Sequence, residues 1–139
     1  MKAAAIVGNG ALAQELSAAS GLPIVSLLAG DDYASFTDIA VVHSLNLGVE
    51  ACIATIRSAA AAHCAAIVWI VGPNIPALER ALIMASIEPL AIELAPTTRL
   101  SSVNATSGAA AEQIWASARF LFSATSTTGQ LLQVGQASW

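Results

Sequence analysis

The sequence predicts an α/β domain built on a doubly wound parallel sheet with helices on both faces. Short, unbroken apolar runs rich in β-branched residues alternate along the chain with longer segments of helical periodicity. Strands that alternate with helices in this way are joined by right-handed crossovers and pair in parallel. At 139 residues the chain is long enough for one core and too short for two ordinary ones, so we expect a single domain over residues 1–139.

In the first part of the chain, strands are expected where the apolar runs are continuous. Residues 3–8 form such a run and end at a glycine, and residues 22–28 and 37–44 are two more, bounded by Gly, Asp or Ser. Buried parallel strands have this pattern. Residues 11–19 are rich in Ala, Leu and Glu at helical spacing, which predicts the first helix.

The alternation continues to the end of the sequence. Further helices are expected at 46–63, 77–95 and 108–124, and further strands at 65–72, 101–108 and 128–134. Pro89 lies inside the helix at 77–95, where a proline lacks the amide hydrogen and costs about 3 kcal/mol. We therefore expect that helix to be broken near Ile87.

The composition indicates more buried surface than one small core needs. Hydrophobic residues make up 56% of the chain and charged residues only 10%, with a mean hydropathy of +0.71. The most apolar run, at 65–72, is far shorter than the roughly 20 residues that cross a bilayer. Residues 1–10 make a poor signal peptide, so we expect a cytoplasmic protein that contacts other subunits.

Charge and cysteine usage exclude other classes of partner. The net charge is −4, and the five Lys and Arg residues are scattered, so the chain has no basic stripe for nucleic acid. Cys52 and Cys64 are too far apart along one helix to form a disulfide, and no Cys or His pair has metal-ligand spacing. We expect two core cysteines and no metal site.

Several stretches together resemble the short-chain dehydrogenase/reductase family. They are AAIVWIVG at 65–72, IELAP at 92–96, VNATSG at 103–108 and ARFLFSATSTTGQLLQVGQ at 118–136, with a weaker match for AAIVGNG at 4–10. The likeness covers most of the chain from Asp38 onward. It implies a truncated Rossmann-like fold, because the chain is shorter than full family members and the shortfall lies in the segments that supply the cofactor walls and the substrate lid.

The resemblance also assigns positions to the family's catalytic residues. That family uses a Tyr as proton donor and acceptor, a Lys four residues on, a Ser that polarises the carbonyl and an Asn in a proton relay. The Tyr and Lys positions hold Ile75 and Glu79, the Ser position holds Val71 or Gly72, and Asn46 remains as a vestige. We therefore expect no catalytic site in this chain.

The glycine-rich turn that binds the cofactor in that family is also altered in this sequence. In the family a glycine-rich turn lets the pyrophosphate approach the backbone at a helix N-terminus. Here Gly8 fits that pattern and Gly10 is displaced, while Leu12 and Gln14 hold the two later glycine positions. Gly8 and Gly10 are vestigial on this interpretation, and we expect neither NAD nor NADP to bind.

The function implied by the resemblance is that of a pseudoenzyme subunit. It would assemble with a catalytic NAD-dependent short-chain dehydrogenase, as a heterotetramer similar in concept to one that oxidises a hydroxyacyl-CoA. Helices 46–63 and 77–95, which pair across a two-fold axis in the family, and the last helix and strand are the expected contacts. The expected interface residues are Ala51, Thr55, Ala59, Leu78, Leu82 and Ala85.

Two other hypotheses remain open at this point. The chain could be an enzyme with altered chemistry that uses His43, Asp38 or Glu79, although a lone histidine is more often a hydrogen-bonded structural residue than a base. It could also be a free-standing homo-oligomeric binding or regulatory protein. A chain that is soluble and well behaved without a partner would favour the homo-oligomer.

Overall fold

The structure, a computed structural model, describes residues 3–25, 33, 35–43 and 48–135. In these residues strands and helices alternate as predicted, except that β2 is followed by β3 with no described helix between them. The elements are β1 (Ala3–Val7), α1 (Ala11–Ser20), β2 (Ile24–Val25), β3 (Phe36–Val42), α2 (Gly48–Ala61), β4 (Ala66–Val71), α3 (Ala77–Leu94), β5 (Arg99–Ala105), α4 (Ala111–Ser123) and β6 (Leu131–Val134). Of the strand expected at 22–28, β2 covers Ile24–Val25, and residues 26–28 lie outside the described part.

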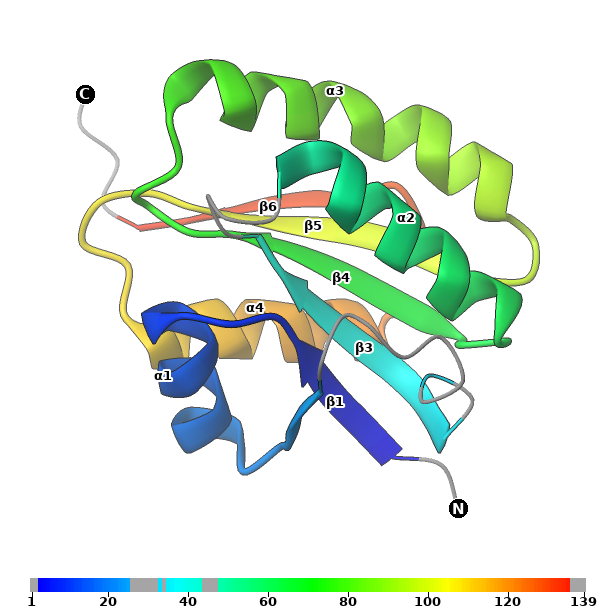
Figure 1. Cartoon of the computed structure of the whole chain (residues 1–139), viewed down its shortest axis with the longest axis horizontal. Coiled ribbons are helices and arrows are strands. Elements are labelled where there is room, and N and C mark those ends of the chain that lie inside the picture. Colours follow the sequence, from blue (N-terminus) through cyan, green and yellow to red (C-terminus); the bar gives the residue numbers. More distant parts are fainter. Residues whose placement is uncertain (1–2, 26–32, 34, 44–47, 136–139) are drawn as a thin grey trace.

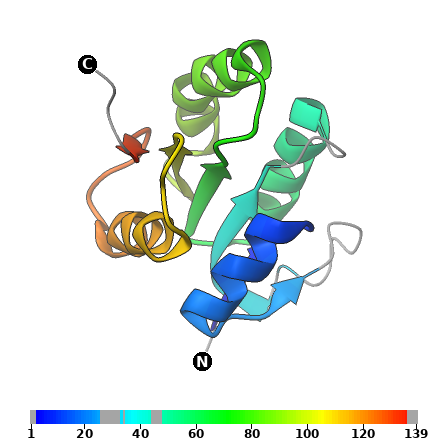
Figure 2. The same ribbon diagram turned by 90° about the vertical axis from the view of Figure 1, so that its left-hand side faces the viewer.

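The strands form one six-stranded sheet in the order β2-β1-β3-β4-β5-β6, and every neighbouring pair is parallel. Helices α2 and α3 cover one face of this sheet, and α1 and α4 cover the other (Figures 1 and 2). The strands all run in the same direction, and the side on which they are added changes after β2, because β2 lies on one side of β1 and β3 to β6 follow on the other. This is the doubly wound, Rossmann-like α/β fold that the alternation predicts.

Each face of the sheet has its own apolar core. Under α2 and α3, alternate strand residues such as Val41 and Trp69 pack against Ile83 and Ile87 of α3. Under α1 and α4, the other set of strand residues packs against helix residues that include Ile114. All six residues of the central strand β4 are buried, so it is covered on both sides.

Helix α3 corrects one prediction, because it runs unbroken from Ala77 to Leu94 through Pro89. Pro89 and Ala85, whose carbonyl loses its usual amide donor, are both on the exposed side of the helix. On the opposite side Ile87 and Leu90 are buried against the sheet. Packing of the buried side therefore keeps the helix continuous. The hydrogen bond that Pro89 cannot make lies at the surface.

Two further expectations concern cysteines and membranes. Cys52 and Cys64 form no disulfide and are both fully buried, which confirms them as core residues. Within the described part of the chain, no helix combines the length and the apolar character that crossing a bilayer requires.

Candidate functional site

The carboxyl edge of the sheet is where this fold places its functional groups, because parallel strands all end there. Three connections meet at this edge: residues 8–10 after β1, His43 after β3, and residues 72–76 between β4 and α3. The positions that the family resemblance assigns to the catalytic Tyr and Lys lie in and just after the third connection. Ile75 precedes α3, and Glu79 is in its first turn.

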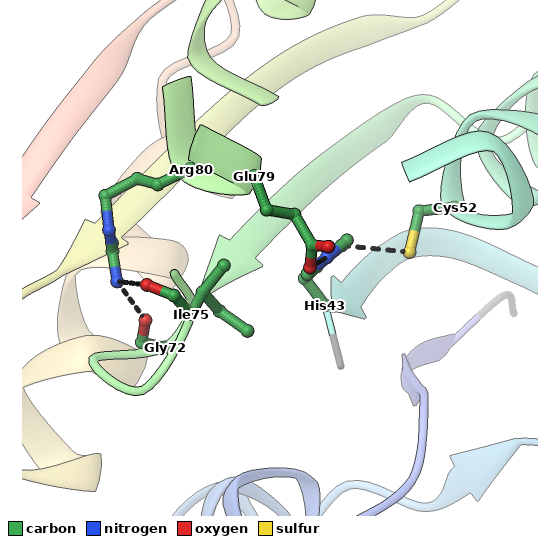
Figure 3. Close-up of polar contacts among 6 residues, drawn as sticks. All are labelled: His43, Cys52, Gly72, Ile75, Glu79 and Arg80. Carbon is green, nitrogen blue, oxygen red and sulfur yellow. Dashed lines mark hydrogen bonds and ion pairs between the residues drawn. The ribbon is translucent and has the colours of Figure 1, made fainter. Parts of the chain in front are cut away.

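A chain of polar contacts links three elements at this edge (Figure 3). His43 Nε2 lies 2.6 Å from Glu79 Oε2, and Cys52 Sγ lies 3.4 Å from His43 Nδ1. The His43 side chain is fully buried, whereas that of Glu79 keeps about a quarter of its surface exposed, 26%. Two residues proposed for altered chemistry, His43 and Glu79, are therefore in contact.

The alternation of strand β3 explains why His43 points into this cluster. Val41 packs in the core under α2 and α3, and two residues later His43 emerges on the same side of the sheet. Its ring lies 5.9 Å from the Trp69 ring, centroid to centroid. The Trp69 indole nitrogen is buried and has no hydrogen-bond partner among the described residues.

The electrostatics of the cluster determine its chemistry. Burial, and secondly the negative charge of Glu79, raise the pKa of Cys52 from 9.0 to about 12. Cys52 is therefore a neutral thiol near pH 7, and a neutral thiol is a poor nucleophile. It can donate its hydrogen to His43 Nδ1 while His43 Nε2–H donates to the Glu79 carboxylate, which makes the cluster a satisfied hydrogen-bond chain.

The third proposed residue for altered chemistry, Asp38, lies elsewhere. It belongs to the first half of β3, toward the amino edge of the sheet, whereas His43 follows the carboxyl end of the same strand. Burial raises the pKa of Asp38, and the nearby positive charge of Arg99 opposes that shift. Asp38 is thus separated from the His43 and Glu79 pair by the length of a strand.

Arg80 is expected to be solvated at the start of its helix, but the structure corrects this, because Arg80 fastens the connection between β4 and α3. Its guanidinium donates to the backbone carbonyls of Gly72 and Ile75 on one side (Figure 3). On the other side it donates to the side-chain oxygen of Asn104 and to the carbonyl of Ala105 at the end of β5. Arg80 is therefore used to hold backbone in place, and its donors face protein acceptors.

The turn after β1 lies at the switch point of the sheet. A Cβ added to Gly8 would come within 3.0 Å of the Val42 carbonyl oxygen, so a glycine is required for β1 and β3 to approach. Leu12 reaches across the crevice, because a Cβ on Gly72 would lie only 2.9 Å from Leu12 Cδ2. Gln14 is exposed on α1 and faces away from this contact. The Leu12 side chain therefore fills space that the glycine of the family pattern would leave open at this position.

Asn46, the residue predicted as a catalytic vestige, lies outside the described residues. Within the described part of the chain, no group of three or more His, Cys, Asp and Glu side chains could hold a metal ion.

The residues predicted for a subunit interface divide into two groups. Ala51 on α2 and Leu78, Leu82 and Ala85 on α3 are exposed. Thr55 and Ala59 correct the prediction, because both are buried within the chain itself. The buried face of α2 also contains Cys52 and Ile56, so helical spacing turns Thr55 and Ala59 toward the sheet. A helix of a partner subunit could not contact these two residues.

The fold and the arrangement of its carboxyl edge define a Rossmann-like α/β protein, and the sequence places it in a family. The profile of the SDR-like family, described as short chain dehydrogenase-like protein, matches residues 40–134, and the chain belongs to that family. This confirms the resemblance at the level of the family. No curated protein matches the sequence significantly.

Two solved structures are similar in fold. One is the FolM alternative dihydrofolate reductase 1 from Brucella suis in complex with NADP, with a TM-score of 0.70 and 11% identity over 96% of this chain and 93% of that chain. The other is the protein lin1944 from Listeria innocua, with a TM-score of 0.63 and 10% identity over 96% of this chain and 100% of that chain. At these identities the likeness shows the fold alone.

Proposed function

We propose that this chain is a non-catalytic subunit that assembles with and stabilises a catalytic NAD-dependent short-chain alcohol dehydrogenase. The observation that supports this most directly is the apolar outer face of α3. A helix at the surface of a monomer normally presents polar side chains to water, whereas the exposed side of α3 carries leucine, isoleucine, alanine and proline between the exposed Glu88 and Glu93.

The outer face of α3 forms a continuous stripe. Leu78 is 75% exposed, Leu82 52% and Ile92 69%, and the exposed Ala85 and Pro89 lie between them. Their spacings of four, three, four and three residues keep all five on one side of the helix. Helix α2 lies beside α3 on the same face of the sheet (Figure 1), and Arg57 of α2 pairs with Glu93 of α3. Ala51 is a further exposed residue of α2.

Such a stripe suits a partner helix that packs against it. The small residues at its centre permit close approach, and the large residues toward its ends supply the buried apolar area. A specific interface of standard size buries about 800 Å² per partner, more than one helix offers, so the partner would also contact α2. In this proposal α2 and α3 form half of a helical bundle, and the last helix and strand, α4 and β6, form a second contact.

The catalytic positions are consistent with a subunit that performs no oxidation itself. The Tyr position holds Ile75, which has no proton to exchange. The Lys position holds Glu79, whose carboxylate is engaged by His43. A carboxylate would raise the pKa of a neighbouring phenol, the opposite of the effect that the family's lysine supplies.

The crevice after β1 also disfavours a dinucleotide. Leu12 occupies space beside Gly72, and the connections at 72–76 and 106–110 are short, which leaves little chain to cover a cofactor. In concept the chain is similar to the inactive subunit of the heterotetrameric 2-(α-hydroxybenzyl)succinyl-CoA dehydrogenase of anaerobic toluene degradation. We propose the same kind of division of labour, with the hydroxyacyl-CoA chemistry performed by the partner.

Purification from native cells tests this proposal. The tagged parent chain and a tagged Leu82→Glu variant would be isolated in parallel and analysed by native mass spectrometry and by NAD-dependent alcohol oxidation. We expect the parent to retain a dehydrogenase with an intact Tyr-x-x-x-Lys motif in fixed stoichiometry, and the variant to lose it together with the activity. A parent chain recovered alone, as a monomer or a homo-oligomer, would overturn the proposal.

The contact between His43 and Glu79 favours a second candidate, an enzyme with altered chemistry. A carboxylate that holds an imidazole is a common arrangement for a general base. The buried His43 ring and the neutral Cys52 thiol weigh against it, because neither reaches the surface. Calorimetry of the isolated chain with NAD and NADP separates the two candidates, since micromolar affinity would favour the enzyme and no heat of binding is expected from the non-catalytic subunit.

A further inference from the structure

A groove lies between the neighbouring helices α2 and α3, on the side of the pair that faces away from the sheet (Figure 1). Its volume is about 290 Å³, and it is lined by Ile53 and Arg57 of α2 and by residues of α3 between Ala85 and Glu93. Ala85 and Pro89 belong both to the α3 stripe and to the groove. A partner that covers the stripe therefore also covers the groove.

The groove contains a backbone acceptor that the helix itself does not use in the ordinary way. In an α-helix each carbonyl accepts from the amide four residues later, and Pro89 has no amide hydrogen to give to the Ala85 carbonyl. Both residues are exposed and line the groove, and carbonyls on the solvent side of a helix tilt outward. A partner that excludes water here without supplying a donor would leave this carbonyl unsatisfied, which is unfavourable.

The other polar groups of the groove are engaged within the chain. Arg57 donates two hydrogen bonds to the Glu93 carboxylate, at 2.7 and 2.8 Å. The Ser86 hydroxyl donates to the Leu82 carbonyl at 2.7 Å. The Ala85 carbonyl is thus the group for which the partner has to provide a hydrogen-bond donor.

The remaining lining of the groove is suited to an aromatic ring. Ile53 is half-buried, Leu90 is 5% exposed, and the Pro89 ring lies beside them. A cavity of about 150 Å³ is enough for benzene, so a groove of this size accommodates a two-ring group. The planar Arg57 guanidinium can also lie against the face of an aromatic ring.

An indole combines these requirements, because it has two fused apolar rings and one N–H that donates and does not accept. On the basis of the assembly proposed above, we propose that the groove binds a tryptophan side chain of the partner subunit. Its rings pack on Ile53, Pro89 and Leu90, and its Nε1–H donates to the Ala85 carbonyl. Tryptophan is among the residues that contribute most to binding at protein interfaces.

Pro89 has a role in assembly on this proposal, since it leaves the Ala85 carbonyl available to the partner. Pro89→Ala restores the amide donor within the helix and should raise the dissociation constant of the natively purified complex at least about tenfold, measured by native mass spectrometry over a dilution series. The same variant should resist urea better than the parent, so weaker assembly would not reflect a damaged fold. Glu88→Ala, on the other side of the stripe, should change the dissociation constant by less than about threefold.

If Pro89→Ala does not fold, Ser86→Leu takes its place, because the larger side chain fills the groove. It should weaken the complex to the same extent. A dissociation constant for the folded groove variant within about twofold of the parent value would overturn the tryptophan site. The assembly proposal would survive that result if Leu82→Glu still separated the subunits, so the two proposals fail separately.

The indole itself is tested on the ¹⁵N-labelled chain, or by competition with the partner where the chain is purified as a complex. We expect N-acetyltryptophanamide to shift the Ser86 and Leu90 amides of the isolated chain with a dissociation constant on the order of 1 mM, or to displace the partner over the same range. N-acetyl-1-methyltryptophanamide, which lacks the N–H, should bind at least about fivefold more weakly. The folded groove variant should lose the response to the unmethylated probe.

Three results of the probe experiment would contradict the inference. They are an absence of any response up to about 10 mM, equal binding of the methylated and unmethylated probes, and a response that persists unchanged in the folded groove variant. A parent chain that is purified alone would end the assembly proposal. The probe would then still decide whether the groove recognises an indole.

Discussion

The two faces of the sheet are built in opposite ways. Under α1 and α4 the interior is apolar, and the outer surface of α4 carries Glu112, Gln113 and Arg119. Under α2 and α3 the interior contains a hydrogen-bond chain centred on His43. The outer surface of α3 carries a stripe of leucine, isoleucine, alanine and proline, flanked by Glu88 and by Glu93, which pairs with Arg57 of α2. An exposed apolar stripe with charged residues along its sides is suited to being covered by another protein.

The difference is sharpest in helices α3 and α4, which pack on β5 from opposite sides. Both are long, and both bury isoleucine and leucine against the sheet. Phe120 is the exposed exception on α4, where it is 60% accessible. On α3 the exposed apolar residues continue over the whole length of the helix, so a local exception does not explain them.

The largest expected effect concerns Cys52, in the polar interior of the α2 and α3 face. Its pKa is raised above that of the unfolded chain, so both states hold the proton below pH 9 and only the unfolded chain releases it above that pH. The free energy of unfolding should therefore fall as the pH rises from 9 toward 12, by up to about 4 kcal/mol from this group.

Denaturant titrations of the parent and of Cys52→Ser at several pH values measure this effect. Because serine does not ionise in this range, the difference in stability between the two chains should change between pH 9 and 11 and stay constant between pH 6 and 8. A difference that is independent of pH throughout would show that the thiol is not protected by burial.

The next effect compares matched glutamates in the first turns of α3 and α4. Glu79→Ala leaves the buried His43 ring nitrogen without its acceptor, which should lower the free energy of unfolding by about 2–3 kcal/mol. Glu112→Ala removes only a favourable interaction with the helix dipole and should cost about 0.5 kcal/mol. Thermal or urea unfolding measures both, and equal losses would remove the distinction between the two faces.

A smaller effect is expected on the outer side of α3. Pro89→Ala restores an amide donor for the Ala85 carbonyl, and the added flexibility of the unfolded chain offsets part of the gain. The free energy of unfolding should rise by about 1.5 kcal/mol, measured by urea denaturation. A loss of stability would mean that the proline, although exposed, fits a backbone bend that the packing of Leu90 requires.

Sequence patterns predicted the order of the elements because the central strands are continuous β-branched runs, as at β3 and β4. Element ends and the effect of Pro89 were less predictable, since both depend on packing. Helical propensity alone breaks α3 near Ile87, whereas Ile87 and Leu90 are buried and the helix is continuous against the sheet. On α2, the rotation of the helix about its axis turns Thr55 and Ala59 toward the sheet. The positions of small residues alone do not predict that rotation.

The contact of His43 with Glu79 was not predicted, although the sequence carried a signal for it. His43 directly follows one parallel strand, and Glu79 begins the helix after the next, so both had to lie at the carboxyl edge. The third member, Cys52, was predicted only as a core residue, because a sequence pattern predicts that a residue is buried more readily than it predicts the hydrogen-bond partner of that residue. The role of Arg80 depends on loop carbonyls whose positions no local pattern reveals.

Sedimentation velocity of the assembled protein tests most directly whether α2 and α3 form its assembly surface. The parent chain, purified with its partner, would be compared with Ala51→Arg, Leu82→Glu and the exposed control Gln14→Glu on α1. A bulky or charged side chain at a buried helix contact should cost about 3–5 kcal/mol, so Ala51→Arg and Leu82→Glu should dissociate while Gln14→Glu stays assembled. A parent that sediments as a 14.1 kDa monomer, or Ala51→Arg and Leu82→Glu chains that remain in the same assembly as the parent, would contradict the scaffold role of this face.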